Sequence, residues 1–237
     1  MASINFGWNN KKSKTMKILI ILAHPELKSF NGAMFLTAIQ TLEAQGHQVK
    51  KLDLYRMGFD PVSDRKNFST VSNPDYFKQQ LEELHATELH GFSELIDQQQ
   101  VLLEWCELMI WQFPLWWYSV PAILKGWVDR VFAMGRVYGD GHFNETGKLK
   151  GKLALLSLTT GDREEAFLPH GSTGSLSGVL RPLQRGILAY TGFSVLRPHV
   201  VFAPVRLTDS QRANELEKWS KRLMSLAKEN SIAVGSY

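Results

Sequence analysis

Four polar side chains follow the first strongly apolar run of the chain at a spacing suited to anion binding. The run Ile18–Ala23 ends at His24, and Lys28, Ser29 and Asn31 come just before a helical pattern. The first N–H groups of a helix have no partner within it and carry partial positive charge, so they bind phosphate readily. The alternative is that Ser29 and Asn31 only cap the helix. Neither a Gly-x-Gly-x-x-Gly pattern nor a Walker loop occurs here.

Consecutive aromatic residues follow another apolar run. Trp116, Trp117 and Tyr118 stand in the segment Phe113–Pro121, just past the end of a predicted strand. Three neighbouring rings are difficult to bury on one side of a loop, which favours at least one facing a planar ligand. A plain cluster of core side chains is the alternative.

Small residues follow a third run. In Thr159-Thr160-Gly161-Asp162, small side chains let backbone N–H groups approach a ligand closely. A phosphate cradle, an aromatic wall and a set of backbone donors together suit a flat, phosphorylated, redox-active heterocycle. The sequence therefore predicts a flavin site.

Strands and helices alternate along the chain and must bring these loops together. The predicted strands are Lys17–Ala23, His47–Leu54, Leu108–Phe113, Lys152–Leu158 and Phe193–Phe202. Helical patterns cover about 34–42, 92–105, 121–132, 175–190 and 208–226, while 55–91 is expected to be a long excursion with short helices. This alternation predicts an α/β fold with one doubly wound parallel sheet, whose strand carboxyl ends share one edge and bind the ligand there.

Composition excludes several classes of protein. The chain has 237 residues and a net charge of +4, but three lysines in residues 1–15 account for most of it, so the balanced remainder argues against nucleic-acid binding. Cys106 is the only cysteine, which excludes internal disulfides and indicates a reducing, cytoplasmic location. In its apolar setting this thiol is expected to be buried and inert. No apolar run is long enough to cross a membrane, and His85 and His90 are too poorly spaced for a metal pair, so no metal is expected.

Longer segments carry a resemblance to a known family. Ile20–Ala33, Gln112–Phe132 (QFPLWWYSVPAILKGWVDRVF), Ser157–Gly161 and Pro182–Phe193 resemble the NAD(P)H:quinone oxidoreductases of the DT-diaphorase type, over about Lys17–Lys228. The resemblance implies a flavodoxin-like fold, with a five-stranded parallel sheet in the order 2-1-3-4-5 and helices on both faces. It also implies a homodimer that binds FAD, or FMN in shorter relatives. We expect residues 16–237 to form a single flavin-binding domain behind a disordered tail, residues 1–15.

Site residues are carried over from the resemblance position by position. Those that would bind the cofactor are His24, Ser29, Phe30, Asn31 and Ala33 at the pyrophosphate, Pro114, Leu115, Trp116, Trp117 and Tyr118 at the isoalloxazine ring, Thr159, Thr160, Gly161 and Asp162 at its pyrimidine edge, and Arg212 at the adenosine end. Lys28 is added to the cofactor-binding residues because it stands beside the anion site. Those that would line the substrate pocket are Trp117, Tyr118, Tyr138, Phe167 and Tyr190, with the tyrosines Tyr138 and Tyr190 coming from the partner subunit. Arg212 favours FAD over FMN only slightly.

The expected reaction is a two-electron reduction of quinones by ping-pong kinetics. NAD(P)H and the quinone would occupy the same place in turn. Catalytic roles are expected for Gly161, Asp162, His170 and Tyr138; of Asp162, only the N–H is expected to face the reduced ring. The mammalian members place a tyrosine and a histidine beside the flavin as a proton relay, but Phe167 and Thr173 stand there in this chain. The proton is expected to come from His170 or from water.

The residues are also compatible with other functions. Azo or nitro compounds are possible side substrates, and some relatives are soluble regulatory subunits of potassium-efflux systems. Turnover of NADPH with a simple quinone by the isolated protein distinguishes an enzyme from a regulatory subunit. The physiological quinone and the choice between NADH and NADPH cannot be derived from the residues.

Overall fold

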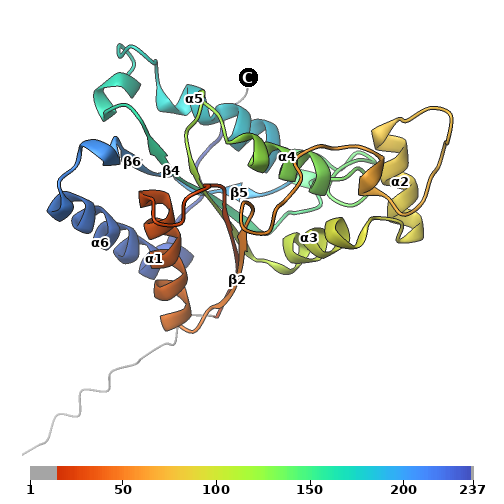
Figure 1. Ribbon diagram of the computed structural model, residues 1–237, viewed down its shortest axis with the longest axis horizontal. Helices are drawn as coiled ribbons and strands as arrows, with labels where there is room; N and C mark the ends of the chain where they lie inside the picture. Colours follow the sequence, from red (N-terminus) through yellow and green to blue (C-terminus); the bar gives the residue numbers. More distant parts are fainter. Residues whose placement is uncertain (1–14, 236–237) are drawn as a thin grey trace, which may run out of the picture.

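A parallel β-sheet forms the centre of the molecule (Figure 1). The computed structural model describes residues 15–235, so the predicted tail lies almost wholly outside the described residues. The strands are β1 (Lys17–Leu22), β2 (Gln48–Asp53), β3 (Leu108–Pro114), β4 (Leu153–Thr160), β5 (Ser194–Val195) and β6 (His199–Phe202). They run in the order β2-β1-β3-β4-β5, with β6 also paired to β4. The predicted α/β class and the order 2-1-3-4-5 are confirmed.

The fifth predicted strand, Phe193–Phe202, is interrupted. β5 pairs with the beginning of β4 and β6 pairs with its end, and Leu196–Pro198 separates the two. These pieces form the edge of the sheet and pair only with β4. Pro198 has no N–H to donate to β4, so the ladder is interrupted there. The expectation of one continuous strand here was wrong, although both pieces keep the parallel direction.

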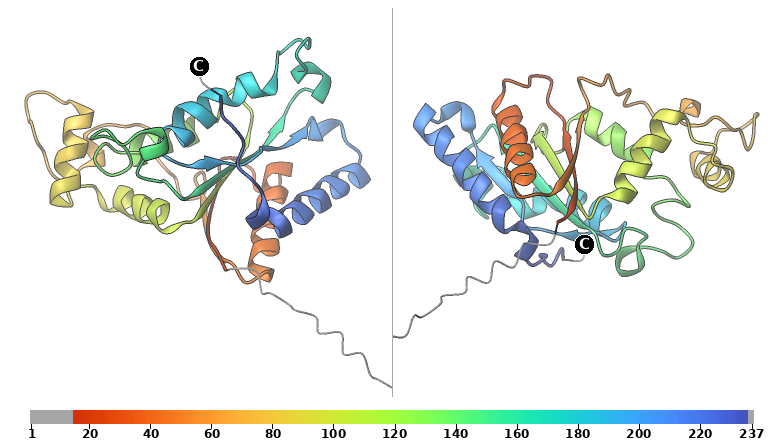
Figure 2. Two further views of the ribbon diagram at one scale, coloured as in Figure 1. Left: turned by 180° about the vertical axis from the view of Figure 1, so that it is seen from behind. Right: turned by 90° about the horizontal axis from the view of Figure 1, so that it is seen from below.

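Helices cover both faces of the sheet (Figures 1 and 2). On one face lie α1 (Phe30–Ala44) and α6 (Asp209–Ser225), and on the other lie α3 (Glu94–Trp105), α4 (Ala122–Val131) and α5 (Leu176–Leu183). Each face has its own apolar core, so β1, β3 and β4 are buried almost throughout.

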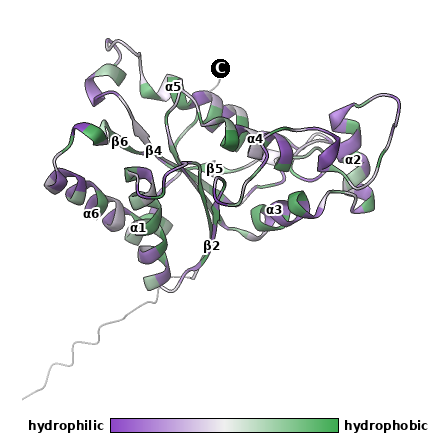
Figure 3. Ribbon diagram, viewed as in Figure 1, coloured by the Kyte–Doolittle hydropathy of each residue, from purple (hydrophilic) through white to green (hydrophobic). Residues whose placement is uncertain are grey.

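The α6 helix is mainly hydrophilic, as its colour in Figure 3 shows. It nevertheless buries Trp219 and Leu223, and Trp219 Nε1 donates a hydrogen bond to the Met34 carbonyl of α1 over 3.0 Å. Thr208 and Gln211 form the predicted capping box at its start. A narrow apolar stripe therefore suffices to dock this helix.

The long excursion, residues 55–91, is ordered and contains α2 (Gln79–Leu89), which lies far from the sheet (Figure 2). The buried Arg130 of α4 holds it, donating from Nε to Asn67 Oδ1 over 2.6 Å and from a terminal nitrogen to the Asp60 carbonyl over 2.5 Å. A Cβ on Gly126 would lie 2.3 Å from the Pro61 carbonyl oxygen, so only glycine permits this close packing. The expected short helices are present.

Candidate functional site

A cavity of about 500 Å³ lies at the carboxyl ends of β1, β3 and β4. Ligands bind at this edge of doubly wound sheets. The residues that line the cavity are His24, Ser29, Phe30, Asn31, Pro114, Leu115, Trp116, Thr159, Thr160, Gly161, Pro204, Val205 and Arg212. The structure therefore brings together side chains from all three loops that the sequence singled out.

The N-terminus of α1 opens into this cavity. Ser29 is the N-cap and its hydroxyl accepts from the Gly32 N–H over 3.1 Å. The capping interpretation is thus correct for Ser29, but a cap leaves the N–H groups of Phe30 and Asn31, in the first turn, beyond the reach of the helix's own carbonyls. Capping and anion binding are therefore compatible at this helix end.

Gly32 fixes how closely α1 approaches the preceding loop. A Cβ at this position would lie 1.9 Å from the Leu27 carbonyl oxygen. No larger residue fits unless the first turn of α1 moves. The glycine thus determines where the helix N-terminus meets the cavity.

A buried hydrogen-bond network joins the three loops beneath the cavity. Asn31 Nδ2 donates to Thr159 Oγ1 over 2.8 Å, and Gln112 Nε2 donates to Asn31 Oδ1 over 2.8 Å. All three side chains are at least 95% buried. Because buried polar groups are costly to leave unpaired, this network holds α1, β3 and β4 in a fixed relation.

The aromatic segment forms a tight, strained turn. Trp116 and Ser119 exchange both backbone hydrogen bonds at 3.0 Å, and the two residues between them, Trp117 and Tyr118, have φ angles of +52° and +57°. This is the two-residue turn that normally takes Asn-Gly, and positive φ costs a non-glycine residue roughly 1–2 kcal/mol. Trp117 is 96% exposed, so the alternative of a core cluster is wrong. Such strain is typical of functional sites.

A fourth loop completes the cavity and was missed by the sequence analysis. It consists of Ala203, Pro204 and Val205, which follow β6 directly. Arg212 anchors it, because one of its terminal nitrogens donates to the Leu207 carbonyl over 2.5 Å and to the Pro204 carbonyl over 3.3 Å. The rule that strand carboxyl ends share one edge, applied to the fifth strand as well, would have found this loop.

Several predicted cofactor residues do not line the cavity. The backbone N–H of Ala33 donates to the Ser29 carbonyl at the start of α1. The side chains of Lys28, just before α1, and of Asp162, next to Gly161, are exposed. Trp117 and Tyr118 project from the strained turn into solvent. Their roles stay predictions.

The expected substrate-pocket tyrosines lie together, away from the cavity. The rings of Tyr138 and Tyr190 are 6.2 Å apart between centroids, and that of Phe143 lies 5.2 Å from Tyr190. Burial raises the pKa of Tyr138, and it also raises the pKa of Glu83, which accepts from the Met134 N–H over 2.6 Å. Glu83 thus anchors the loop that carries Tyr138.

Two further candidates have different surroundings. Phe167 is buried and packs its ring 5.7 Å from that of Phe202, whereas His170 is exposed on a loop. Neither lines the cavity in this chain. A role for either residue stays a prediction.

Cys106 is buried and inert, as expected. Its thiol contacts the Leu103 carbonyl at 3.2 Å, and burial raises the pKa of this thiol to about 11. Within residues 15–235, no group of three or more His, Cys, Asp and Glu side chains is placed to hold a metal ion. No helix in this range is long and apolar enough to cross a membrane.

Comparisons with known proteins agree with this geometry. Residues 16–223 match the family described as having a flavodoxin-like fold. The chain is 41% identical over 217 residues to the Homo sapiens ribosyldihydronicotinamide dehydrogenase (quinone), covering 91% of this chain and 94% of that protein. It is 36% identical over 217 residues to the Rattus norvegicus NAD(P)H dehydrogenase (quinone) 1, covering 91% and 79%.

A solved structure is also similar to this chain over most of its length. The putative quinone reductase from Klebsiella pneumoniae superimposes with a TM-score of 0.89 and 36% identity, over 92% of this chain and 87% of that one. The chain therefore belongs to the flavodoxin-like fold family and, within it, to the group of quinone reductases that these relatives represent.

Proposed function

We propose that this chain is a flavin-dependent NAD(P)H:quinone oxidoreductase that works as a homodimer in the cytoplasm. One observation carries the proposal: four strand-end loops enclose a single cavity whose residues match the expected cofactor contacts at eleven positions. The names of relatives more than 35% identical to the chain support quinone as the acceptor.

The cavity suits a flavin in shape and charge. No acidic side chain of the described residues lines it, and the N-terminus of α1 supplies positive charge. Arg212 also lines the cavity, but its guanidinium is ion-paired with Asp209. A phosphate would bind at the N–H groups of Phe30 and Asn31, and the ring system would lie between Trp116 and Gly161. These are the positions that the sequence analysis assigned to the pyrophosphate and the ring.

When bound, a flavin supplies hydride transfer from a nicotinamide to a quinone. The chain's part is to orient the rings and to stabilise negative charge at the pyrimidine edge, where N–H groups of Thr160–Asp162 would donate. The Thr160 hydroxyl donates to the Asp162 carbonyl over 2.7 Å, which holds this loop in shape. The carboxylate of Asp162 would turn to solvent.

Substrates would stack beside the exposed turn at Trp117 and Tyr118. Because donor and acceptor would use the same face in turn, the kinetics should be ping-pong. A partner subunit would complete the pocket with the cluster formed by Tyr138, Phe143 and Tyr190, which is the reason for proposing a homodimer. The proton would come from His170 or from water, since Phe167 and Thr173 cannot act as the family's relay pair.

FAD is the proposed cofactor and FMN the alternative. Arg212 lines the cavity, but its guanidinium also donates to the carbonyls of Pro204 and Leu207. The main role of Arg212 is therefore to hold the fourth loop in place. As an argument for FAD over FMN, its position near the expected adenosine end counts only slightly.

Steady-state kinetics with menadione tests the proposal. NADH, NADPH and ribosyldihydronicotinamide should be compared as donors, because the relatives' names include both NAD(P)H and ribosyldihydronicotinamide. At least one donor should give turnover, with parallel lines in double-reciprocal plots. Turnover with none of the three, by a flavin-loaded protein, would contradict the proposed activity.

A further inference from the structure

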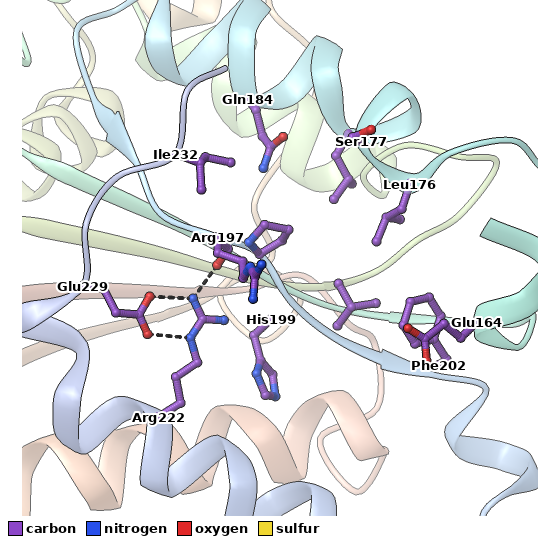
Figure 4. Close-up of a pocket in the computed structure, with 13 residues that line it drawn as sticks. Glu164, Leu176, Ser177, Gln184, Arg197, His199, Phe202, Arg222, Glu229 and Ile232 are labelled. Carbon is purple, nitrogen blue, oxygen red and sulfur yellow. Dashed lines mark hydrogen bonds and ion pairs between the residues drawn. The ribbon is translucent and has the colours of Figure 1, made fainter. Parts of the chain in front are cut away.

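A second cavity, of about 720 Å³, lies at the edge of the sheet between α5 and the end of α6 (Figure 4). Its walls are α5, the segment Arg197–Phe202 that includes β6, and the chain end around Ile232. None of its lining residues lines the cavity proposed for the flavin. The volume is within the range of small-molecule sites.

A buried amide without a partner points into this second cavity. Gln184 is only 5% exposed, and its Nε2 has no hydrogen-bond partner among the described residues. Figure 4 shows its side chain descending from the helix with the nitrogen toward the cavity. Buried donors are rarely left unpaired, so each such group requires an explanation.

The backbone around Gln184 is irregular as well. Pro182 lies inside α5, and directly after this helix Gln184 begins a π-helical turn, Gln184–Ala189. π-Helical turns within helices occur frequently at functional sites. The side-chain amide of Gln184 therefore extends from a π-helical turn rather than from a regular α-helix.

A second orphaned polar atom lines the same cavity. His199 stacks on Trp219 with the ring centroids 4.3 Å apart, and its Nε2 is buried with no partner among the described residues. Burial lowers the pKa of His199 to about 4, so the imidazole is neutral at physiological pH. A neutral imidazole nitrogen can donate to a ligand oxygen.

Charge defines one end of the cavity. Arg222 and Glu229 form a two-bond ion pair at 2.8 Å and neutralise each other. Arg197 has no ion-pair partner within residues 15–235, and Glu164 lies at the opposite end in Figure 4. An anionic group of a ligand would therefore lie near Arg197 and away from Glu164.

The rest of the lining is largely apolar. Its apolar lining residues include Leu176, Leu180, Phe202 and Ile232. A free inorganic anion would leave these side chains uncovered. The ligand must have an apolar body as well as an acceptor group.

We propose that this second cavity binds a small monocarboxylate with an apolar body, with its carboxylate at Gln184 and Arg197 and its body along Leu176, Leu180 and Phe202. The site is independent of the flavin. Its existence does not depend on the proposed quinone reduction.

Calorimetric titration of the flavin-saturated protein with octanoate tests this site. We expect saturable binding of one octanoate per chain, with weaker binding of 1-octanol, which lacks the charge. Octanoate should leave the KM for menadione unchanged. Absence of saturable binding, equal affinity for 1-octanol, or competition with menadione would each overturn the proposal.

Two variants locate the site. Gln184→Leu removes the buried amide, and Arg197→Gln removes the charge of an exposed side chain. Each should weaken octanoate binding about tenfold, while the matched control Arg56→Gln, on the distant excursion, should bind like the original protein. Unchanged affinity in Arg197→Gln would overturn the proposal even if Gln184→Leu failed to fold.

Discussion

The amide nitrogen of Asn31 donates to the hydroxyl of Thr159 over 2.8 Å, and this bond joins the start of α1 to the end of β4. The two residues are 128 positions apart in the chain and belong to two different loops of the proposed flavin site. Gln112 extends the link to β3 through Asn31. The relative position of the phosphate end and the ring end of the cavity thus depends on one buried side chain.

Asn31→Ala should destabilise the protein and weaken flavin binding together. The substitution removes the hydrogen bonds that join Asn31 to the buried Gln112 and Thr159, at a cost of about 1–3 kcal/mol. Urea unfolding and flavin titration measure the two effects. Thr41→Val is the control, because it breaks a hydrogen bond between Thr41 and Ser220 at 2.9 Å, away from the cavity. If both variants changed flavin affinity equally, the positioning role of Asn31 would be wrong.

Gly32→Ala should displace the first turn of α1. The new Cβ would lie 1.9 Å from the Leu27 carbonyl oxygen, so the backbone must shift, with an expected loss of about 1–3 kcal/mol. Flavin affinity should fall about tenfold, because the N–H groups of Phe30 and Asn31 move with the turn.

Gly178→Ala is the matched control for this glycine. There the nearest atom to a new Cβ is the flexible Ser175 hydroxyl, at 3.2 Å. This variant should keep the original flavin affinity. A Gly32→Ala protein with unchanged affinity and stability would show that α1 is not held as described.

Trp117→Gly should impair activity with menadione while leaving the stability of the fold almost unchanged. Trp117 is 96% exposed at φ +52°, so glycine relieves strain and removes almost no packing. The free energy of unfolding should change by less than about 1 kcal/mol, whereas the KM for menadione should rise. Trp127→Ala, at a fully buried tryptophan, should instead cost about 3–5 kcal/mol. A menadione KM unaffected by Trp117→Gly would remove this turn from the substrate site.

His199 should make the protein less stable in mild acid. Its folded pKa, about 4, is below the ordinary value of 6.5, so the unfolded chain takes up the proton first as the pH falls. The contribution of His199 to the free energy of unfolding is complete above pH 6.5 and is lost progressively toward pH 4. The loss between pH 7.5 and pH 5 is about 2 kcal/mol.

His199→Phe retains an aromatic ring against Trp219 and removes the titration. Urea unfolding at pH 7.5 and pH 5 should show a smaller loss for this variant than for the original protein. Equal losses would mean that His199 titrates normally.

The sequence predicted the fold well because its signals are local. The apolar runs of β1, β3 and β4 are long and uninterrupted, and their order follows from the family resemblance. Pro198 stands inside the predicted fifth strand, and its missing N–H marks the position of the break. For the site, the residues that follow β1, β3 and β4 could be found from strand ends alone.

The features of the site that the sequence did not predict depend on tertiary structure. Ala203–Val205 borders the cavity only because β6 pairs with the end of β4, and Arg212 reaches this loop from α6. Likewise, the aromatic run favoured an exposed ring, but that Trp117 is the ring in solvent depends on the positive φ angles of Trp117 and Tyr118, which no local pattern indicates. The orphaned amide of Gln184 depends on a π-helical turn that no sequence pattern marks.

Identification of the chromophore tests the central claim most directly. The purified protein should be yellow, and heating should release one flavin nucleotide per chain, to be identified by mass as FAD or FMN. A colourless protein that remains colourless, with no bound flavin after incubation with either nucleotide, would contradict the account.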